Sequence, residues 1–411
     1  MSKTEIPSIR FHGFDDAWEQ RKLGELVDRV VRKNTNNEST LPLTISAQYG
    51  LVDQITYFNN RVASRDVSNY YLVLNGEFAY NKSTSDGYPF GAVKRLDLYE
   101  KGVLSTLYIV FAPKKEQQID SDYLTVFFDT DRWHKGVAER AAEGARNHGL
   151  LNISAEDFFD IDLSVPKDIV EQKQIGAFIR QLDNLITLHQ RKFEKLTNVK
   201  KSMLEKMFPR NGSCYPEIRF KGFTDPWEQR KVGDLLIERN QQAPMSDEYP
   251  LMAFIASEGV APKGERYDRS ALVTDTVNKL YKKTEKGDFI YSSNNLETGS
   301  IGLNKYGKAC ISPVYSIFEP TGIADSDFLG RRLVRKDFIN AMVKWRQGVI
   351  YGQWRIHESD FLKIEITVPS VEEQRKIGAY LDQLDNLITL HQRELEKLQS
   401  TKKALLEKMF V

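Results

Sequence analysis

The feature that most restricts the fold of this chain is an internal duplication. Blocks near the start of the chain, and a block in its middle, return later in the same order. Repeated blocks of this kind are expected to have the same structural role in each copy, so the sequence predicts two copies of one fold. The matching pairs are Ile9–Phe11 with Ile218–Phe220, Trp18–Lys22 with Trp227–Lys231, and Leu182–Arg191 with Leu384–Arg393.

The segments between these blocks diverge in sequence. Residues from about Leu43 to Phe159 and from Tyr249 to Phe361 are rich in Tyr, Phe, Val and Ile, interrupted by Gly and Asn. This composition predicts short strands joined by turns, with some helix near 120–142 and 326–346. Weak similarity survives inside them, since Gly76–Tyr80 resembles Gly287–Tyr291. We therefore expect a tandem, pseudo-twofold repeat of two globular α+β domains whose surfaces differ.

Each half ends in a segment with apolar residues at alternating steps of four and three, the heptad pattern of a coiled-coil seam. Asp168 with Glu171, and Ser370 with Glu373, have the spacing of a capping box, so a helix is expected to begin at each. Pro209 ends the first helix. The seam positions are Ile175, Ile179, Leu182, Ile186, His189, Phe193, Leu196, Lys200, Met203 and Met207, then Ile377, Leu381, Leu384, Ile388, His391, Leu395, Leu398, Lys402, Leu405 and Met409.

Two long helices in one duplicated chain are expected to pair with each other. A helix of about 37 residues is roughly 55 Å long. Pairing is antiparallel if a pseudo-twofold axis relates the two halves, and the helices then separate the two domains as a rigid rod. The predicted boundaries are 1–165 for the first globular domain with its repeated N-terminal segment, 166–212 for the first long helix, 213–368 for the second globular domain and 369–411 for the second long helix.

Four seam positions carry polar side chains. His189 and His391 could form a pH switch or a metal pair, but no acidic or cysteine partner stands at metal-ligand spacing. We favour a structural role in which the histidines fix the register of the helices. Lys200 and Lys402 are expected to leave the seam, with their long side chains reaching water.

Several loops of the divergent segments carry side chains suited to duplex DNA. Arginine pairs well with guanine and asparagine or glutamine with adenine, while Ser, Thr and Lys commonly bind phosphates. Such residues also occur in ordinary solvated turns, so the prediction concerns the loops collectively. The candidates are Asn81, Lys82, Ser83, Thr84, Arg140, Arg146, Asn147 and His148 in the first domain, and Ser292, Ser293, Asn294, Asn295, Lys305, Arg346, Tyr351, Gln353 and Arg355 in the second.

No catalytic centre or metal site is expected from the sequence. The segment Gly302–Ala309 is close to a phosphate-binding P-loop, but it ends in Ala309 where Ser or Thr would hold magnesium. We interpret it as a turn between strands. The two cysteines, Cys214 and Cys310, are too few for a disulfide framework and suit a reducing cytoplasm. No apolar run approaches the length of a membrane span, and the net charge of +1 does not indicate a partner.

The combination resembles the specificity subunits of type I restriction-modification systems over nearly the whole chain. The resemblance rests on the Trp-Glu-Gln-Arg-Lys block before each divergent segment and on the Val-Pro pair after it, at Val165-Pro166 and Val368-Pro369. It also rests on the Gln-x-x-Ile-Gly start of each helix, at Gln172–Gly176 and Gln374–Gly378, and on the repeated Leu-Asp-Asn-Leu-Ile-Thr-Leu-His-Gln-Arg block. Each motif alone is weak, but their order and duplication are specific.

The resemblance implies a non-catalytic subunit that binds double-stranded DNA. Each divergent segment would be a target recognition domain that reads one half of a split, asymmetric sequence. The helices would set the gap and dock two DNA adenine methyltransferase subunits, and two ATP-dependent restriction subunits join for cleavage. S-adenosylmethionine, ATP and magnesium are expected in those partners, with no cofactor on this chain. Half-sites read from one face of DNA lie about 34 Å apart, which a rod of this length suits.

Two other interpretations remain open. A coiled-coil scaffold that joins protein partners without reading DNA would explain the seam, but not two divergent domains at fixed places in a duplicated frame. An ATPase would need Gly302–Ala309 as its nucleotide site. We rank the DNA-recognition subunit first and the enzyme last.

Overall fold

A computed structural model describes residues 6–46, 49–85, 87–141, 149–210, 212–256, 258–262, 279–294, 296–350 and 353–411. The chain forms two compact units. The first consists of Met1–Arg191 with Gln392–Val411, and the second of Lys192–His391. Each unit holds one α+β domain, the first turns of one long helix and the last turns of the other.

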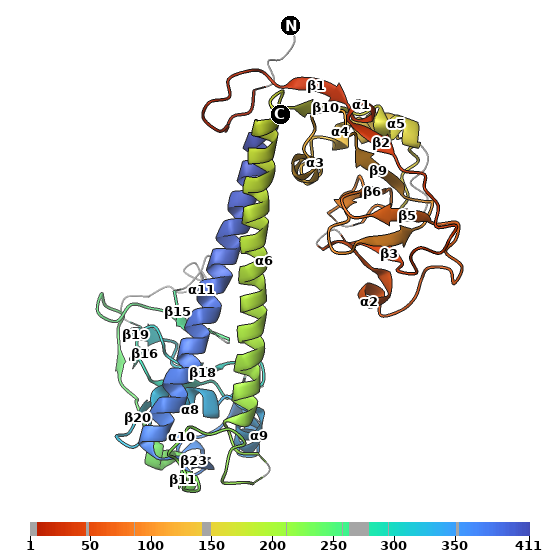
Figure 1. Cartoon of the computed structure of the whole chain (residues 1–411). Helices are drawn as coiled ribbons and strands as arrows, with labels where there is room; N and C mark the ends of the chain where they lie inside the picture. The colour runs from red at the N-terminus through yellow and green to blue at the C-terminus, as the bar shows by residue number, and fades with distance from the viewer. Residues whose placement is uncertain are drawn as a thin grey trace. The chain divides into compact units, whose positions relative to one another are not determined.

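The first unit contains ten described strands and the beginning of the first long helix (Figure 1). In chain order its elements are β1 (Glu19–Lys22), α1 (Leu23–Leu26), β2 (Val27–Arg29), β3 (Leu43–Ser46), β4 (Gly50–Asp53), α2 (Gln54–Phe58), β5 (Tyr71–Leu74), β6 (Phe78–Asn81), β7 (Ala92–Arg95), β8 (Lys101–Leu104), β9 (Ile109–Pro113), α3 (Ser121–Phe128), α4 (His134–Arg140), α5 (Ala155–Phe159), β10 (Asp162–Val165) and α6 (Ile169–Lys206).

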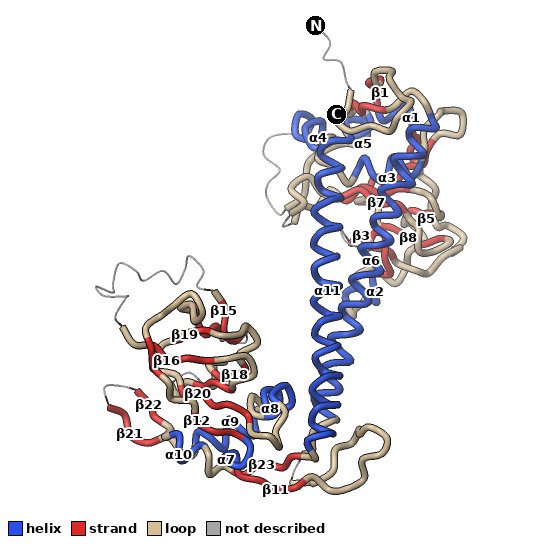
Figure 2. Tube along the Cα trace, turned by 90° about the vertical axis from the view of Figure 1, so that its left-hand side faces the viewer, coloured by secondary structure: helices blue, strands red, loops and turns tan. Residues whose placement is uncertain are grey.

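The second unit repeats much of this series (Figure 2). Its elements are β11 (Glu228–Lys231), α7 (Val232–Leu235), β12 (Leu236–Glu238), β13 (Gln242–Ala243), β14 (Ala253–Ile255), β15 (Gly259–Ala261), β16 (Tyr281–Thr284), β17 (Phe289–Tyr291), β18 (Ile301–Leu303), β19 (Ala309–Ile311), β20 (Ser316–Pro320), α8 (Ser326–Arg332), α9 (Lys336–Val343), β21 (Gln347–Ile350), β22 (Gln353–Arg355), α10 (Glu358–Phe361), β23 (Glu365–Val368) and α11 (Val371–Met409).

The central sheets of the two domains have the same strand order, which confirms the predicted repeat of one α+β fold. The order is β2-β9-β6-β7 in the first domain and β12-β20-β17-β18 in the second. The registers also correspond, because Phe78 is opposite Phe111 and Phe289 is opposite Phe318. These aromatic pairs are buried, so the alternation of Phe and Tyr along β6 and β17 fixes which face of each strand meets the core.

The repeated Glu-Gln-Arg-Lys block forms a strand that closes each domain. β1 pairs antiparallel with β10, and β11 pairs antiparallel with β23 (Figure 1). The tryptophan before each strand, Trp18 or Trp227, is buried in the core of its own unit. The blocks before and after each divergent segment therefore join, and the segment between them can vary without changing how the domain is attached.

The core of each unit includes the end of a long helix that comes from the opposite half of the sequence. Phe410, just beyond α11, lies 6.0 Å ring to ring from Trp18 in the first unit. Phe208, just beyond α6, lies 6.1 Å from Trp227 in the second. Both phenylalanines are buried. The Met-Phe pairs at 207–208 and 409–410 therefore anchor each helix end to the domain it reaches.

Within each unit the start of one long helix packs against the end of the other, so the pairing is antiparallel. Ile175 and Ile179 share the first core with Met409, and Ile377 and Leu381 share the second with Met207. All the predicted seam residues of α6 and α11 are buried or half-buried, including Leu182, Ile186, His189, Phe193, Leu384, Ile388, His391 and Leu395.

Candidate nucleic-acid interface

In the first domain the loop after β6 is joined to the segment that leads to α5. The Thr84 amide donates to the Gly149 carbonyl at 2.7 Å, and the Leu151 amide donates to the Lys82 carbonyl at 3.0 Å. Ser83 forms an isolated bridge with Leu150. The predicted loop 81–84 therefore lies directly beside residues 149–151.

The second domain brings together the loops at the corresponding places. Ser293 Oγ accepts a hydrogen bond from the Ile356 amide at 3.0 Å, and its carbonyl accepts one from Arg346 at 3.1 Å. The loop after β17 therefore contacts the segment around β21 and β22. Ser292 is buried and Asn294 is half-buried, so only part of this loop faces solvent.

Arg346 is held by an acidic neighbour. Its guanidinium forms two hydrogen bonds of 2.7 Å with the carboxylate of Glu297, and its side chain is only 12% exposed. This contact lowers the pKa of Glu297. The guanidinium also lies 5.9 Å from the Trp354 ring. Arg346 is thus held beside the candidate loop by the Glu297 carboxylate and the Ser293 carbonyl.

Two of the predicted residues take part in other contacts. Arg140 donates to the Asp160 carboxylate at 2.8 Å and to the Asp160 carbonyl at 2.7 Å, which joins α4 to the turn before β10. Together with Lys22, whose hydrogen bond is the larger influence, it lowers the pKa of Asp160. Lys305 lies in the turn between β18 and β19 and pairs with Asp382 of α11 at 2.7 Å. Neither contact involves the loops after β6 and β17.

The structure describes some of the remaining candidate residues and not others. Asn81 accepts a hydrogen bond from the Ser83 amide at 3.0 Å, which shapes the loop. Gln353 lies in β22, and Arg355 in the same strand is 67% exposed. The predicted residues Arg146, Asn147, His148, Asn295 and Tyr351 lie outside the described residues.

Two exposed tryptophans next to these loops were missed by the sequence reasoning. Trp345 is 39% exposed and Trp354 is 44% exposed. Both flank residues that were predicted, Arg346 and Arg355. A tryptophan in an α+β domain is ordinarily expected in the core, so sequence offered no signal that these two face solvent.

The repeated Ile-Arg-Phe motif ties both long helices to each domain. The Ile9 amide donates to the Lys408 carbonyl at the end of α11 at 3.0 Å. Arg10 forms hydrogen bonds of 2.6 and 2.8 Å with Glu171, which is 1% exposed at the start of α6. Phe11 packs edge-on against Phe178 at 5.7 Å. All three positions of the motif therefore serve the junction of domain and helices.

The second unit reproduces this junction with its own residues. The Ile218 amide donates to the Lys206 carbonyl at 3.0 Å, and Arg219 pairs with Glu373 through two hydrogen bonds of 2.7 Å. The hydrogen bonds to these glutamates are the main reason that the pKa of Arg10 and of Arg219 is raised. The short side chains of the predicted caps accept backbone hydrogen bonds, Asp168 from the Val170 amide and Ser370 from the Glu373 amide, while the glutamates of the predicted boxes bond the arginines.

The Gln-x-x-Ile-Gly start of each helix is explained by close contact with a short helix. The Gln172 amide group accepts from the Asp120 backbone at 2.9 Å and donates to the Pro166 carbonyl at 2.8 Å. A Cβ at Gly176 would lie 2.8 Å from the Tyr123 amide nitrogen, so only glycine fits. Gln374 makes the equivalent bonds, and a Cβ at Gly378 would lie 2.6 Å from an Asp325 oxygen.

The expectation that the seam lysines extend to water is wrong for Lys402, whereas Lys200 is 33% exposed and also forms an ion pair. Lys402 forms ion pairs of 2.7 Å with Asp183 and 3.2 Å with Asp129, and its side chain is 18% exposed. Lys200 pairs with Asp385, the counterpart of Asp183 in the repeat. Both lysines form ion pairs with carboxylates from other segments of the chain. The heptad position of a lysine does not predict which of those segments lies beside it.

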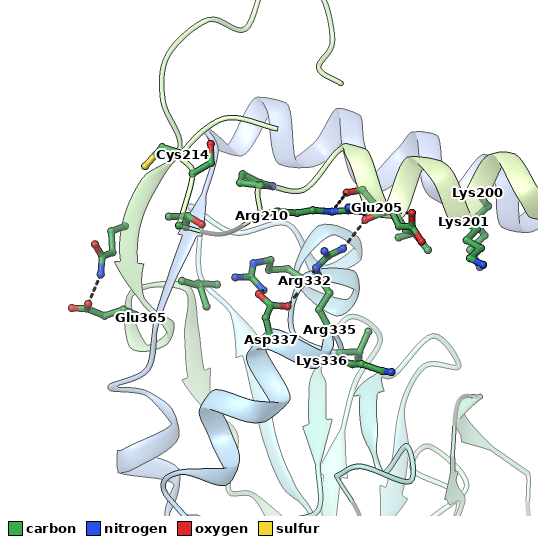
Figure 3. Close-up of a pocket in the computed structure, with 18 of the residues that line it drawn as sticks. Lys200, Lys201, Glu205, Arg210, Cys214, Arg332, Arg335, Lys336, Asp337 and Glu365 are labelled. Atoms are coloured by element: carbon green, nitrogen blue, oxygen red, sulfur yellow. Dashed lines mark hydrogen bonds and ion pairs between the residues drawn. The ribbon is translucent and has the colours of Figure 1, made fainter. Parts of the chain in front are cut away.

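A hollow of about 1270 Å³ lies at the end of α6, wholly inside the second unit (Figure 3). Basic side chains line it, and three of the arginines among them make local contacts. Arg335 donates to the Leu204 carbonyl at 2.6 Å, Arg332 pairs with Asp337 at 2.9 Å, and Arg210 donates to the Glu205 carbonyl at 3.1 Å. Arg335 and Arg210 satisfy carbonyls near the end of α6, where positive charge is favourable.

The segment Gly302–Ala309 is a turn between β18 and β19, as predicted. The Asn304 side chain accepts from the amides of Tyr306 and Gly307 and is fully buried. A strand follows it, where a P-loop requires a helix. Among the residues that the structure describes, no three His, Cys, Asp or Glu side chains gather as a metal site, and no helix is long and apolar enough to cross a membrane.

Two copies of one α+β domain, with unlike loops and matching junctions to two long helices, define a tandem-repeat protein. A family model described as type I restriction modification DNA specificity domain matches residues 16–198 and again residues 224–400. The chain therefore belongs to the type I restriction-modification DNA specificity family.

Individual relatives agree with this assignment. The chain is 23% identical over 428 residues to the putative type I restriction enzyme MjaX specificity subunit of Methanocaldococcus jannaschii, covering 99% of this chain and 94% of that protein. It is 24% identical over 382 residues to the MjaVIII specificity subunit of the same organism, covering 85% and 82%. The crystal structure of a type I restriction-modification S subunit from M. genitalium has the same fold, with a TM-score of 0.58, 14% identity and 98% and 99% coverage.

Proposed function

We propose that this chain is the specificity subunit that directs a type I restriction-modification complex to a two-part, asymmetric DNA sequence. Each recognition domain, within 1–165 and 213–368, reads one half-site. The spacer segments, 166–212 and 369–411, set the gap between the half-sites. The chain itself is non-catalytic and acts in the cytoplasm.

The proposal rests on a contrast between the parts of the two domains. Their sheets, closing strands and helix junctions are repeated, whereas their loops differ in sequence. The sheet order, the closing strands and the helix junctions are the same in both domains. The loop after the corresponding strand reads Asn-Lys-Ser-Thr at 81–84 but Ser-Ser-Asn-Asn at 292–295. Because base edges are distinguished by the donors and acceptors that face them, two unlike loops on one frame suit two unlike half-sites.

The repeated helices supply the surfaces that can bind identical partners twice. We propose that two DNA adenine methyltransferase subunits dock on them, and that two ATP-dependent restriction subunits join the complex. S-adenosylmethionine, ATP and magnesium then belong to those partners. The family membership and the repeated Leu182–Arg191 and Leu384–Arg393 blocks support this arrangement.

Single-molecule mapping of methyladenine in host DNA, with and without this gene, tests the proposal. We expect one two-part motif, with unlike halves and a fixed gap, to lose its methylation when the gene is deleted. A methylated continuous palindrome that depends on this gene would contradict the proposal. So would an unchanged methylation map together with partners that include no methyltransferase, a result that would favour a scaffold.

A further inference from the structure

Helix α2 of the first domain exposes neighbouring apolar side chains. None of its residues, Gln54–Phe58, is buried, and it lies at the end of the domain away from β1 and β10 (Figure 1). Tyr57 is 49% exposed, Phe58 is 50% exposed and the nearby Val62 is 67% exposed. A patch of this kind on a folded domain commonly marks a site of interaction.

The patch is built on an ordered backbone. Asp53 caps the helix, accepting from the Ile55 amide at 3.0 Å and from the Thr56 hydroxyl at 2.6 Å. The Gln54 side chain accepts from the Ala63 amide at 2.6 Å, which closes the loop that follows the helix. The Tyr57 and Phe58 rings lie edge to face, 5.0 Å apart. The aromatic surface is thus held in position before any ligand binds.

The polar groups around the rings are amides and cations. Asn59 and Asn60 are exposed, and so are Arg61 and Arg65. Arg61 donates to the Ser64 carbonyl at 3.0 Å, which holds the side chain against its own loop. No Asp or Glu occurs between Gln54 and Arg65, and the Asp53 carboxylate is occupied by the cap. The surface therefore carries two arginines, and the exposed carboxylate of Asp66, which accepts a hydrogen bond from the Ser68 amide, lies directly after them in the chain.

We propose that Tyr57, Phe58 and Arg61 form a DNA-contacting element of the first recognition domain, separate from the loop after β6. Aromatic side chains stack on bases or wedge between base steps, amides pair with adenine, and guanidinium groups bind guanine or phosphate. The inference rests on the proposed function, and it names residues of the first domain that recognise one half-site.

The sequence favours DNA over a protein partner at this surface. Residues Tyr57–Arg61 lie inside a divergent segment, and the order Tyr-Phe-Asn-Asn-Arg occurs nowhere else in the chain. A subunit that docks twice on the repeated frame needs features that are present twice. A half-site is read by one domain only, so a recognition element is expected to be unique to that domain.

The test uses the full chain co-expressed with its methyltransferase subunit. Tyr57→Ala with Phe58→Ala, and separately Arg61→Ala, are each expected to weaken binding to the target duplex roughly ten- to a hundredfold. The methylation map should become degenerate in one half of the motif and stay unchanged in the other. Matched controls in the same domain are Leu107→Ala, with the leucine 63% exposed, and Lys135→Ala, with the side chain 84% exposed.

Each outcome is decisive. If the variants bind and methylate as the wild type does, the inference is wrong and the proposed function stands. If they lose the methyltransferase subunit on co-purification, the surface docks protein and the inference is again wrong. If the wild-type complex has no sequence-specific binding, the proposed function and the inference both fail. Should the double variant not fold, Arg61→Ala and Phe58→Leu carry the test.

Discussion

At the scale of single residues, the most consequential side chains are the two glutamates that begin the long helices. Glu171 and Glu373 are each 1% exposed, and each holds an arginine through two hydrogen bonds. A buried ion pair is not strongly stabilising when it is compared with apolar packing, but loss of one partner leaves a buried charge uncompensated. The pairs therefore join each domain to the start of its long helix through a contact that is costly to break.

Glu171→Gln is expected to lower the free energy of unfolding by roughly 3–5 kcal/mol, because Arg10 keeps its charge in a largely buried position. Glu373→Gln should have a similar effect in the second unit. Urea denaturation followed by circular dichroism measures both. The control is Glu372→Gln, since the Lys376–Glu372 pair is 51% and 73% exposed and should contribute only about 0.3–0.5 kcal/mol. Equal effects of Glu171→Gln and Glu372→Gln would contradict this role of the buried pair.

At the scale of secondary-structure elements, the long helices and the domains stabilise each other through polar as well as apolar contacts. Lys402 of α11 bonds Asp183 of α6 and Asp129 at the end of α3. Burial raises the pKa of Asp129, but Lys94 and Lys402 more than offset this effect, so that its pKa lies below the ordinary value. This lysine therefore connects three elements in the first unit.

Lys402→Met is expected to destabilise the protein by about 1.5–3 kcal/mol at pH 7, the range for a hydrogen bond to a charged group. A carboxyl whose pKa is lowered by folding stabilises the native state above its unfolded pKa, and this contribution is lost as the pH falls through the folded value. The difference between variant and wild type should therefore shrink as the pH falls below about 4.

Thermal denaturation between pH 3 and pH 8 checks this expectation, with Lys195→Met as the control at an exposed position on α6. A difference that stays constant down to pH 3 would show that the packing of the lysine side chain, and not its charge, stabilises the junction.

The same elements show which features could be predicted from the sequence alone. The heptad spacing and the caps predicted the bounds of α6 and α11 to within a few residues. Both signals depend only on residues that lie close together in the sequence. The partner of Lys402 at Asp129 could not be found in this way, because the two lie far apart in the chain and meet only after the domain and the helix have packed. The exposure of Trp354 and the burial of Ser292 depend on long-range packing in the same manner.

At the scale of the whole molecule, the duplication separates attachment from recognition. The closing strands, the Ile-Arg-Phe junctions and the helix ends hold each divergent segment by residues outside it, with Trp18 and Trp227 at equivalent places in the two cores. A divergent segment that packs against the same closing strands should therefore be able to replace the segment of this chain as a unit. Specificity would change while the frame, and the surfaces proposed to dock the methyltransferase subunits, would be preserved.

Replacement of residues 43–159 by the matching segment of another member of the family is therefore expected to change one half of the methylated motif and to leave the other half and the gap unchanged. The measurement is the methyladenine map of cells that carry the chimera. The matched control replaces 249–361 in the same way and should change only the other half, because each loop set is anchored in its own domain. A chimera that altered both halves, or the gap between them, would mean that the two domains do not read independently.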